Sequence, residues 1–150
     1  MNRTALLLFV LLLPSGLLAG EKIAGTNSYI LNQNTWEYGS GVFWNQDNQG
    51  TFEASSGPFD HGPVRCIGSG FSDINGTKGE GICIYGYGAD TFTWAWQAHQ
   101  EGSNTWQVIG STGKYIGMTG EGTAVTIVDS IYRSIPHRVT RWEGVIDLPN

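Results

Sequence analysis

The chain has 150 residues, of which 14% are charged, and its net charge is −5. Its eight Lys and Arg residues are scattered, which excludes a basic surface that follows a nucleic-acid backbone and disfavours an anionic membrane. We expect no nucleic-acid partner, and a length that suits one domain with a single core.

The first twenty residues predict a signal peptide over 1–20. Arg3 gives a positive start, Leu6 to Leu13 form an apolar run, and small residues precede a cleavage site after Ala19 or Gly20. The apolar run is shorter than the about 20 residues of a permanent membrane-spanning helix, although a membrane anchor is the alternative. We therefore expect a secreted or periplasmic protein that does not contact the membrane after cleavage.

The next segment, residues 21–35, is mostly polar and is expected to form a flexible N-terminal arm. Beyond it, residues 36–150 are expected to form one all-β domain. Beyond residue 20 the chain has only two leucines, Leu31 and Leu148, whereas Ile, Val, Thr and aromatic residues, which suit strands, are abundant. Glycines separate the apolar runs as turn residues do. The runs predict eight strands, at 36–44, 50–55, 63–73, 79–87, 91–99, 105–110, 122–129 and 137–148.

Short connections between these strands favour an antiparallel meander. Eight such strands can close into a small barrel that has no exposed edge, and this is the architecture we predict. An open sandwich of the same strands is the alternative.

The dipeptide Asn75-Gly76 lies between two of the predicted strands and is a strong hairpin signal. This hairpin brings Cys66 and Cys83 nearly opposite each other. In an exported protein such a pair is expected to form a disulfide, and two free thiols are the alternative. Two cysteines and three scattered histidines lack the spacing of a metal site, so we expect no metal and no cofactor.

The segment from Trp106 to Thr123 contains Gly-Ser-Thr-Gly-Lys-Tyr-Ile-Gly followed by Thr-Gly-Glu-Gly-Thr. It resembles the strand–loop–strand signature of allene-oxide-cyclase-like barrel proteins, of which dirigent proteins share a looser version. Similarity extends from Trp36 to Pro149, and the closing Arg141-Trp142-Glu143-Gly144 fits bacterial exported members of the group. The resemblance implies an eight-stranded, calycin-like barrel. It implies no particular reaction, although the plant cyclases confine a fatty-acid epoxide in an apolar lumen.

The loop within this signature is interpreted as structural. Four glycines, at 110, 113, 117 and 120, permit positive φ and close passage of the backbone at a tight corner. Tyr115 and Met118 are expected to plug one end of the barrel.

Several strand residues are candidates for a site. Arg141 and Glu143 are two apart and so share one face of the last strand. If that face is internal, burial would tune Glu143 as an acid or base, with Glu53 and Arg65 as further catalytic candidates. If it is external, these groups form ordinary solvated pairs. The candidate ligand-binding residues are Trp94, Trp96 and Arg141.

Three functions follow from these observations. The first is a barrel that binds a small apolar molecule in its lumen. The second is a cyclase or isomerase that confines a reactive molecule, and the third is a structural or self-associating protein whose barrel is filled. Aromatic side chains such as Trp94 and Trp96 either form the core of such a barrel or line a pocket in it.

Overall fold

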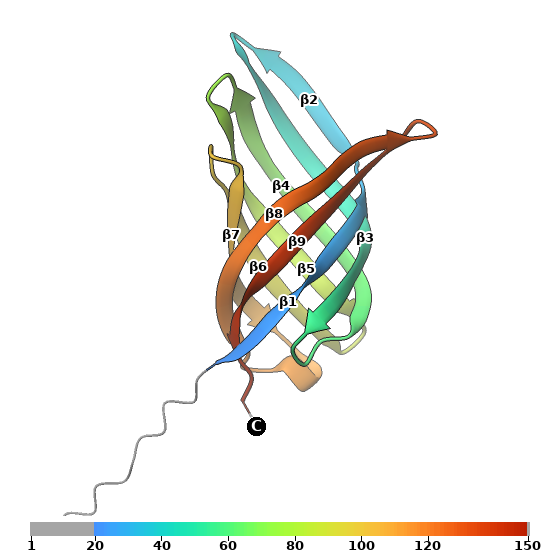
Figure 1. The fold of residues 1–150 in the computed structure, drawn as a ribbon, viewed down its shortest axis with the longest axis vertical. Coiled ribbons are helices and arrows are strands. Elements are labelled where there is room, and N and C mark those ends of the chain that lie inside the picture. Colours follow the sequence, from blue (N-terminus) through green and yellow to red (C-terminus); the bar gives the residue numbers. More distant parts are fainter. Residues whose placement is uncertain (1–19, 150) are drawn as a thin grey trace, which may run out of the picture.

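The computed structural model describes residues 20–149, so the predicted signal peptide lies outside the described residues except for Gly20. Among the described residues, no helix is long and apolar enough to cross a membrane. Antiparallel strands make up most of this part of the chain, as Figure 1 shows. They are β1 (Glu21–Ile30), β2 (Gln33–Tyr38), β3 (Gly41–Ser56), β4 (His61–Asp73), β5 (Gly76–Tyr87), β6 (Asp90–Ala98), β7 (Ser103–Ser111), β8 (Thr119–Tyr132) and β9 (Ile135–Asp147), with one 3₁₀ turn, η1 (Gly113–Tyr115).

Eight of these strands close into a barrel. From β3 to β9 each strand pairs with the next one along the chain, and β1 pairs with both β9 and β3 to close the ring. β2 pairs only with the first part of β3, and this hairpin lies beyond the closed part of the barrel (Figure 1). The predicted eight-stranded antiparallel barrel is confirmed, and the open sandwich is wrong because every barrel strand has a neighbour on each side.

The first part of the chain differs from the expectation. The flexible arm expected over residues 21–35 is wrong, because β1 is a full barrel strand with hydrogen-bonded neighbours on both sides. The strand predicted over 36–44 is a hairpin that turns at Gly39, and the one predicted over 50–55 is the second half of β3. The eight-strand count was therefore reached with one strand missed and one divided.

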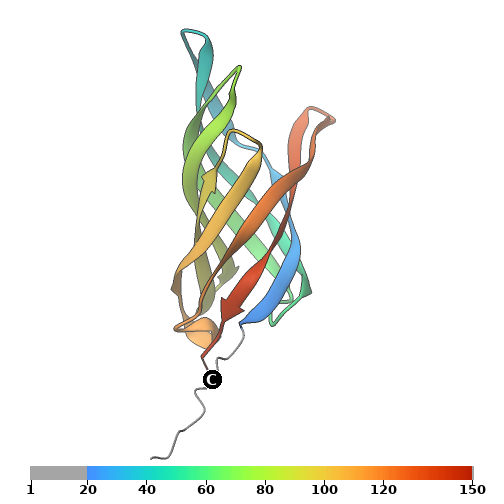
Figure 2. The same cartoon turned by 60° about the vertical axis from the view of Figure 1, so that its left-hand side comes forward.

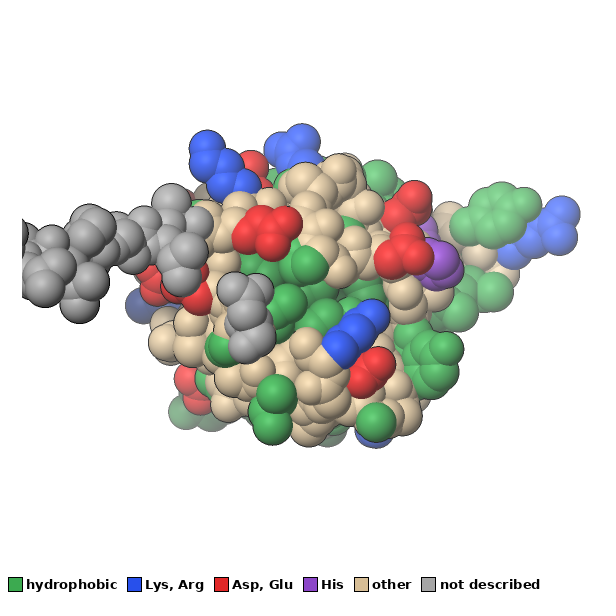
Figure 3. Space-filling view, turned by 90° about the horizontal axis from the view of Figure 1, so that it is seen from below, with side chains coloured by type: hydrophobic (Ala, Val, Ile, Leu, Met, Phe, Trp, Pro, Cys, Tyr) green, Lys and Arg blue, Asp and Glu red, His purple; other side chains and the backbone are tan. Residues whose placement is uncertain are grey.

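The two ends of the barrel differ. At one end the β2–β3 and β4–β5 hairpins reach furthest, and the β8–β9 hairpin leans outward (Figures 1 and 2). The opposite end carries both ends of the described chain and η1, and Figure 3 shows apolar side chains filling its middle. As expected, Tyr115 and Met118 are buried there, and Phe59 stacks on Phe92 behind them. The barrel is therefore plugged at the η1 end.

Inward glycines make room for indole rings inside the barrel. Gly68 and Gly81 are cross-strand partners, and a Cβ atom on either would collide with the ring of Trp96. Gly122 and Gly144 stand in the same relation to Trp106. A pair of glycines thus lies against each of these indole rings, and this lets a small barrel hold several large side chains.

The predicted disulfide is confirmed. Cys66 and Cys83 are direct partners across β4 and β5, with their Cα atoms 4.0 Å apart. Both are buried and face the interior, so the bridge is part of the inner wall of the barrel.

Candidate functional site

The barrel encloses a cavity of about 330 Å³ that opens at the end opposite η1, and we call this cavity the lumen. Strand alternation directs Trp94 and Trp96 of β6 into it, since they share a face two residues apart. Its inner wall also includes the disulfide. Five of the six tryptophans line it, namely Trp44, Trp94, Trp96, Trp106 and Trp142.

The aromatic wall is closely packed around Trp94. Its ring stacks on Trp106 with centroids 4.0 Å apart and lies 4.4 Å from the ring of Tyr85. Nearer the opening, the rings of Trp44 and Trp96 are parallel within 9°. Such mutual packing, at distances typical of favourable aromatic pairs, holds the wall in one arrangement.

A hydrogen-bonded network lies at the inner end of the lumen and centres on Asn27. The amide nitrogen of Asn27 donates to the hydroxyls of Tyr29 and Tyr85, at 2.6 Å and 2.9 Å. Its amide oxygen accepts from Nε1 of Trp142 at 3.0 Å. Tyr29 in turn donates to Sγ of Cys66 at 3.2 Å, because a disulfide sulfur carries no proton. Asn27 is 3% exposed, and all three of its polar hydrogen-bonding positions are used.

The two phenols of this network stay protonated. Burial raises the pKa of Tyr85 well above its ordinary value, and the nearby Tyr29 raises it further, against the hydrogen bond from Asn27. Burial likewise raises the pKa of Tyr29, against the opposing effects of Asn27 and Arg138. Both groups therefore act as hydroxyl donors and not as phenolate bases.

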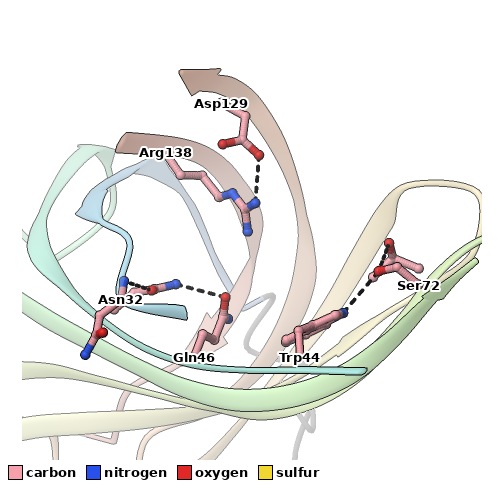
Figure 4. Close-up of polar contacts among 8 residues, drawn as sticks. Asn32, Trp44, Gln46, Ser72, Asp129 and Arg138 are labelled. Carbon is pink, nitrogen blue, oxygen red and sulfur yellow. Dashed lines mark hydrogen bonds and ion pairs between the residues drawn. The ribbon is translucent and has the colours of Figure 1, made fainter. Parts of the chain in front are cut away.

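The mouth of the lumen is polar. Figure 4 shows Arg138 of β9 donating to Asp129 of β8 at 2.7 Å. On the facing wall, Nε1 of Trp44 donates to Oγ of Ser72 at 3.1 Å. Beside it, the side chain of Asn48 joins the backbone of Asn32 to the side chain of Gln46. An apolar molecule entering the lumen would pass this polar collar before it meets the indole rings.

The structure places two of the predicted ligand-binding residues, Trp94 and Trp96, in the lumen. The third, Arg141, is exposed on the outer wall of the barrel. There it lines a shallow groove of about 220 Å³ across β1, β3 and β9, together with Glu53 and Glu143. These three residues do come together, but outside the barrel and on a solvated face, with no ion pair between them among the described residues.

Arg65 is also on the outer wall, where its guanidinium binds Asp47 through two hydrogen bonds of 2.7 Å and 2.6 Å. These bonds lower the pKa of the Asp47 carboxyl. Glu53, Arg65 and Glu143 are therefore unavailable to a molecule held in the lumen.

Sequence reasoning missed the residues that form the polar parts of the lumen. Asn27 and Tyr29 fell in the segment expected to be an arm, because β1 buries every second residue but Gly25 and Asn27 interrupt the apolar pattern of its inward face. Arg138 was hidden because the inward face of the last strand was unknown. His99 also lies at the mouth, where its Nε2 contacts Oγ1 of Thr105 at 3.0 Å.

Comparison with protein-family models and with curated proteins finds no match to this chain. Among solved structures, the pterocarpan synthase dirigent protein PsPTS1 superposes with a TM-score of 0.51 at 10% identity, covering 86% of this chain and 95% of that chain. The pterocarpan synthase dirigent protein GePTS1 gives 0.49 at 11% identity, covering 96% of each chain. The chain has a dirigent-like barrel fold. This agrees, at the level of the fold, with the resemblance carried by residues 106–123, and function must be argued from the site.

Proposed function

We propose that this protein binds a small, largely apolar molecule in its lumen. The observation that carries the proposal is a cavity of about 330 Å³ that is walled by indole rings and open at one end. Its size and its aromatic inner wall match those of small-molecule sites, and its polar groups gather at the mouth and around Asn27. Because the rings are already packed against one another, little order has to be gained when a ligand enters.

The filled barrel of a structural protein has less support than a ligand site. Its interior would be packed by side chains throughout, whereas here dense packing is found at the η1 end and a cavity occupies the other.

The proposal also includes the location of the protein. The disulfide, the predicted signal peptide and the 106–123 signature all support a secreted or periplasmic protein, of the bacterial exported kind.

Fluorescence of 6-propionyl-2-(dimethylamino)naphthalene, an apolar probe whose polar groups are acceptors only, tests the proposal. Ala98 lines the lumen from β6, so A98F should fill it and weaken probe binding at least tenfold, whereas A95F on the opposite face of the same strand should not. Circular dichroism checks that both variants fold. Saturable binding by the wild type that is lost only in A98F supports the proposal, and equal binding by both variants contradicts it.

A second candidate function is isomerisation of the bound molecule, favoured by the pairing of Arg138 with Asp129 at the mouth. In this scheme Asp129 takes a proton from a carbon atom beside a carbonyl group and returns it to the product. Exchange of the methyl protons of 2-acetylnaphthalene in D₂O, followed by NMR, tests it. Exchange faster than in buffer that is lost in D129N supports the activity, and exchange at the buffer rate contradicts it.

A further inference from the structure

We propose that the molecule bound in the lumen carries a hydrogen-bond acceptor oxygen that pairs with the indole N–H groups of Trp94 and Trp96. The inference rests on the proposed function and narrows its ligand class. It predicts a flat aromatic ketone, ester or carboxylate, and it predicts poor binding of pure hydrocarbons and of ligands whose polar group is a donor.

The indole nitrogens of the lumen fall into two groups. Those of Trp44, Trp106 and Trp142 each donate a hydrogen bond, to Oγ of Ser72, the carbonyl oxygen of Thr123 and Oδ1 of Asn27. Those of Trp94 and Trp96 are buried and have no partner among the described residues. Trp94 is 2% exposed, so bulk water does not satisfy its N–H group.

Two further residues of the lumen, Tyr85 at its inner end and Arg138 at its mouth, also have unused donors. The Tyr85 hydroxyl accepts from Asn27, and its own proton has no acceptor among residues 20–149. Arg138 uses one Nη atom on Asp129, while its Nε is buried without a partner in that same range. The amide oxygen of Asn27 is already occupied by Trp142. Every buried side-chain nitrogen or oxygen atom without a partner in the described part of the chain is thus an N–H donor.

A buried donor without a partner costs free energy, which a ligand acceptor recovers on binding. A ligand that places a carbonyl or carboxylate oxygen at Trp94 or Trp96 gains the free energy of this hydrogen bond, and a hydrocarbon of the same shape does not. An ammonium group placed at Trp94 or Trp96 would instead face their N–H donors. The indole faces beside these N–H groups favour a flat ring as the body of the ligand.

Three naphthalene probes of matched shape separate these cases. The first, 2-acetylnaphthalene, carries a ketone oxygen. The second, 2-isopropenylnaphthalene, has the same shape but no acceptor, and the third, 2-naphthoate, carries a carboxylate. Calorimetric titration of the full chain should give an affinity for the ketone or the carboxylate about tenfold above that for the hydrocarbon, as expected for one recovered hydrogen bond.

Two variants assign the effect to the indole donors. W94F removes the unpaired N–H and keeps an aromatic ring, so the ketone-to-hydrocarbon ratio should fall about threefold or more, and W96F gives an independent test if W94F does not fold. W36F makes the same chemical change at an exposed indole outside the lumen, so the ratio should stay as in the wild type.

The outcomes separate this inference from the proposed function. Hydrocarbon binding as tight as ketone and carboxylate binding, or a ratio unchanged in both W94F and W96F, would overturn the acceptor inference and leave a working apolar lumen. Failure of all three probes to bind would overturn the proposed function itself.

Discussion

Asn27 connects side chains from three strands at the inner end of the lumen. It bonds Tyr29 of its own strand, Tyr85 of β5 and Trp142 of β9, all with little or no exposure to solvent. A buried network of this kind stabilises one arrangement when every member is satisfied, and it is costly when one member is lost. We therefore regard Asn27 as the residue that fixes the positions of the lumen's two phenols.

N27A should lower the free energy of unfolding by about 3 kcal/mol, because it leaves the Tyr29, Tyr85 and Trp142 groups without their partner. Urea denaturation followed by tryptophan fluorescence measures this. N34A is the matched control, since Asn34 makes an exposed bond to Asn45 and its loss should cost under about 0.5 kcal/mol. Equal stability of the two variants would show that the network does not hold the barrel together.

The buried phenols also predict a loss of stability in alkali. Their pKa values are raised above the ordinary 10.0, so above about pH 10 the unfolded chain loses these protons while the folded chain keeps them. The free energy of unfolding should fall there, by up to about 1.4 kcal/mol per pH unit for each phenol. Denaturant titrations between pH 8 and pH 11.5 measure the slope, and Y85F should reduce it. A slope that Y85F leaves unchanged would contradict this assignment.

At the scale of the elements, the disulfide links β4 to β5 within the wall of the lumen. The bridge closes a loop with a sequence separation of 17, for which the chain-entropy relation gives about 3 kcal/mol. C66A/C83A, or reductant on the wild type, should lower Tm by about 10 °C. Reductant should leave the Tm of the double variant unchanged. Identical melting of the wild type with and without reductant would argue against a stabilising bridge.

The elements also show where sequence reasoning works. The six strands from β4 to β9 were predicted within a few residues, because most are apolar or β-branched runs bounded by glycine or Asn-Gly. The turn between β8 and β9 instead uses Arg133 and Ser134. β1 was missed because its inward side chains include Gly25 and Asn27, which lower its apparent hydrophobicity. Both have reasons in the packed barrel, since a Cβ at Gly25 would collide with the ring of Trp142 and Asn27 supplies the polar network. Neither reason is visible before the strands are assembled.

At the scale of the whole molecule, closure and the disulfide could be predicted, but the inward face of each strand could not. Trp94 and Trp96 were identified as ligand-binding residues because aromatic side chains alternate along β6, and they do line the lumen. Arg141, Glu53, Arg65 and Glu143 lie outside because the parity of their strands directs them to solvent. Parity depends on how the strands pair, which a single sequence does not specify where both faces carry large side chains.

The barrel is asymmetric along its axis, and this asymmetry underlies the account. One end is plugged by aromatic packing around Phe59, Phe92 and Tyr115, and the other opens through a polar collar. On the proposed function, a ligand enters from one side only, past Arg138 and Asp129, and comes to rest against the indole rings. The outer groove beside Glu53 is separate from this route.

Indole N–H resonances offer the most direct test of the lumen as the binding site. A ¹⁵N-labelled full chain has six such signals, five from residues that line the lumen and one from Trp36, which is 50% exposed on β2. On titration with 2-acetylnaphthalene, the account predicts that the Trp94 and Trp96 signals shift while the Trp36 signal stays in place. A shift confined to Trp36, or no shift at saturating ligand, would contradict it.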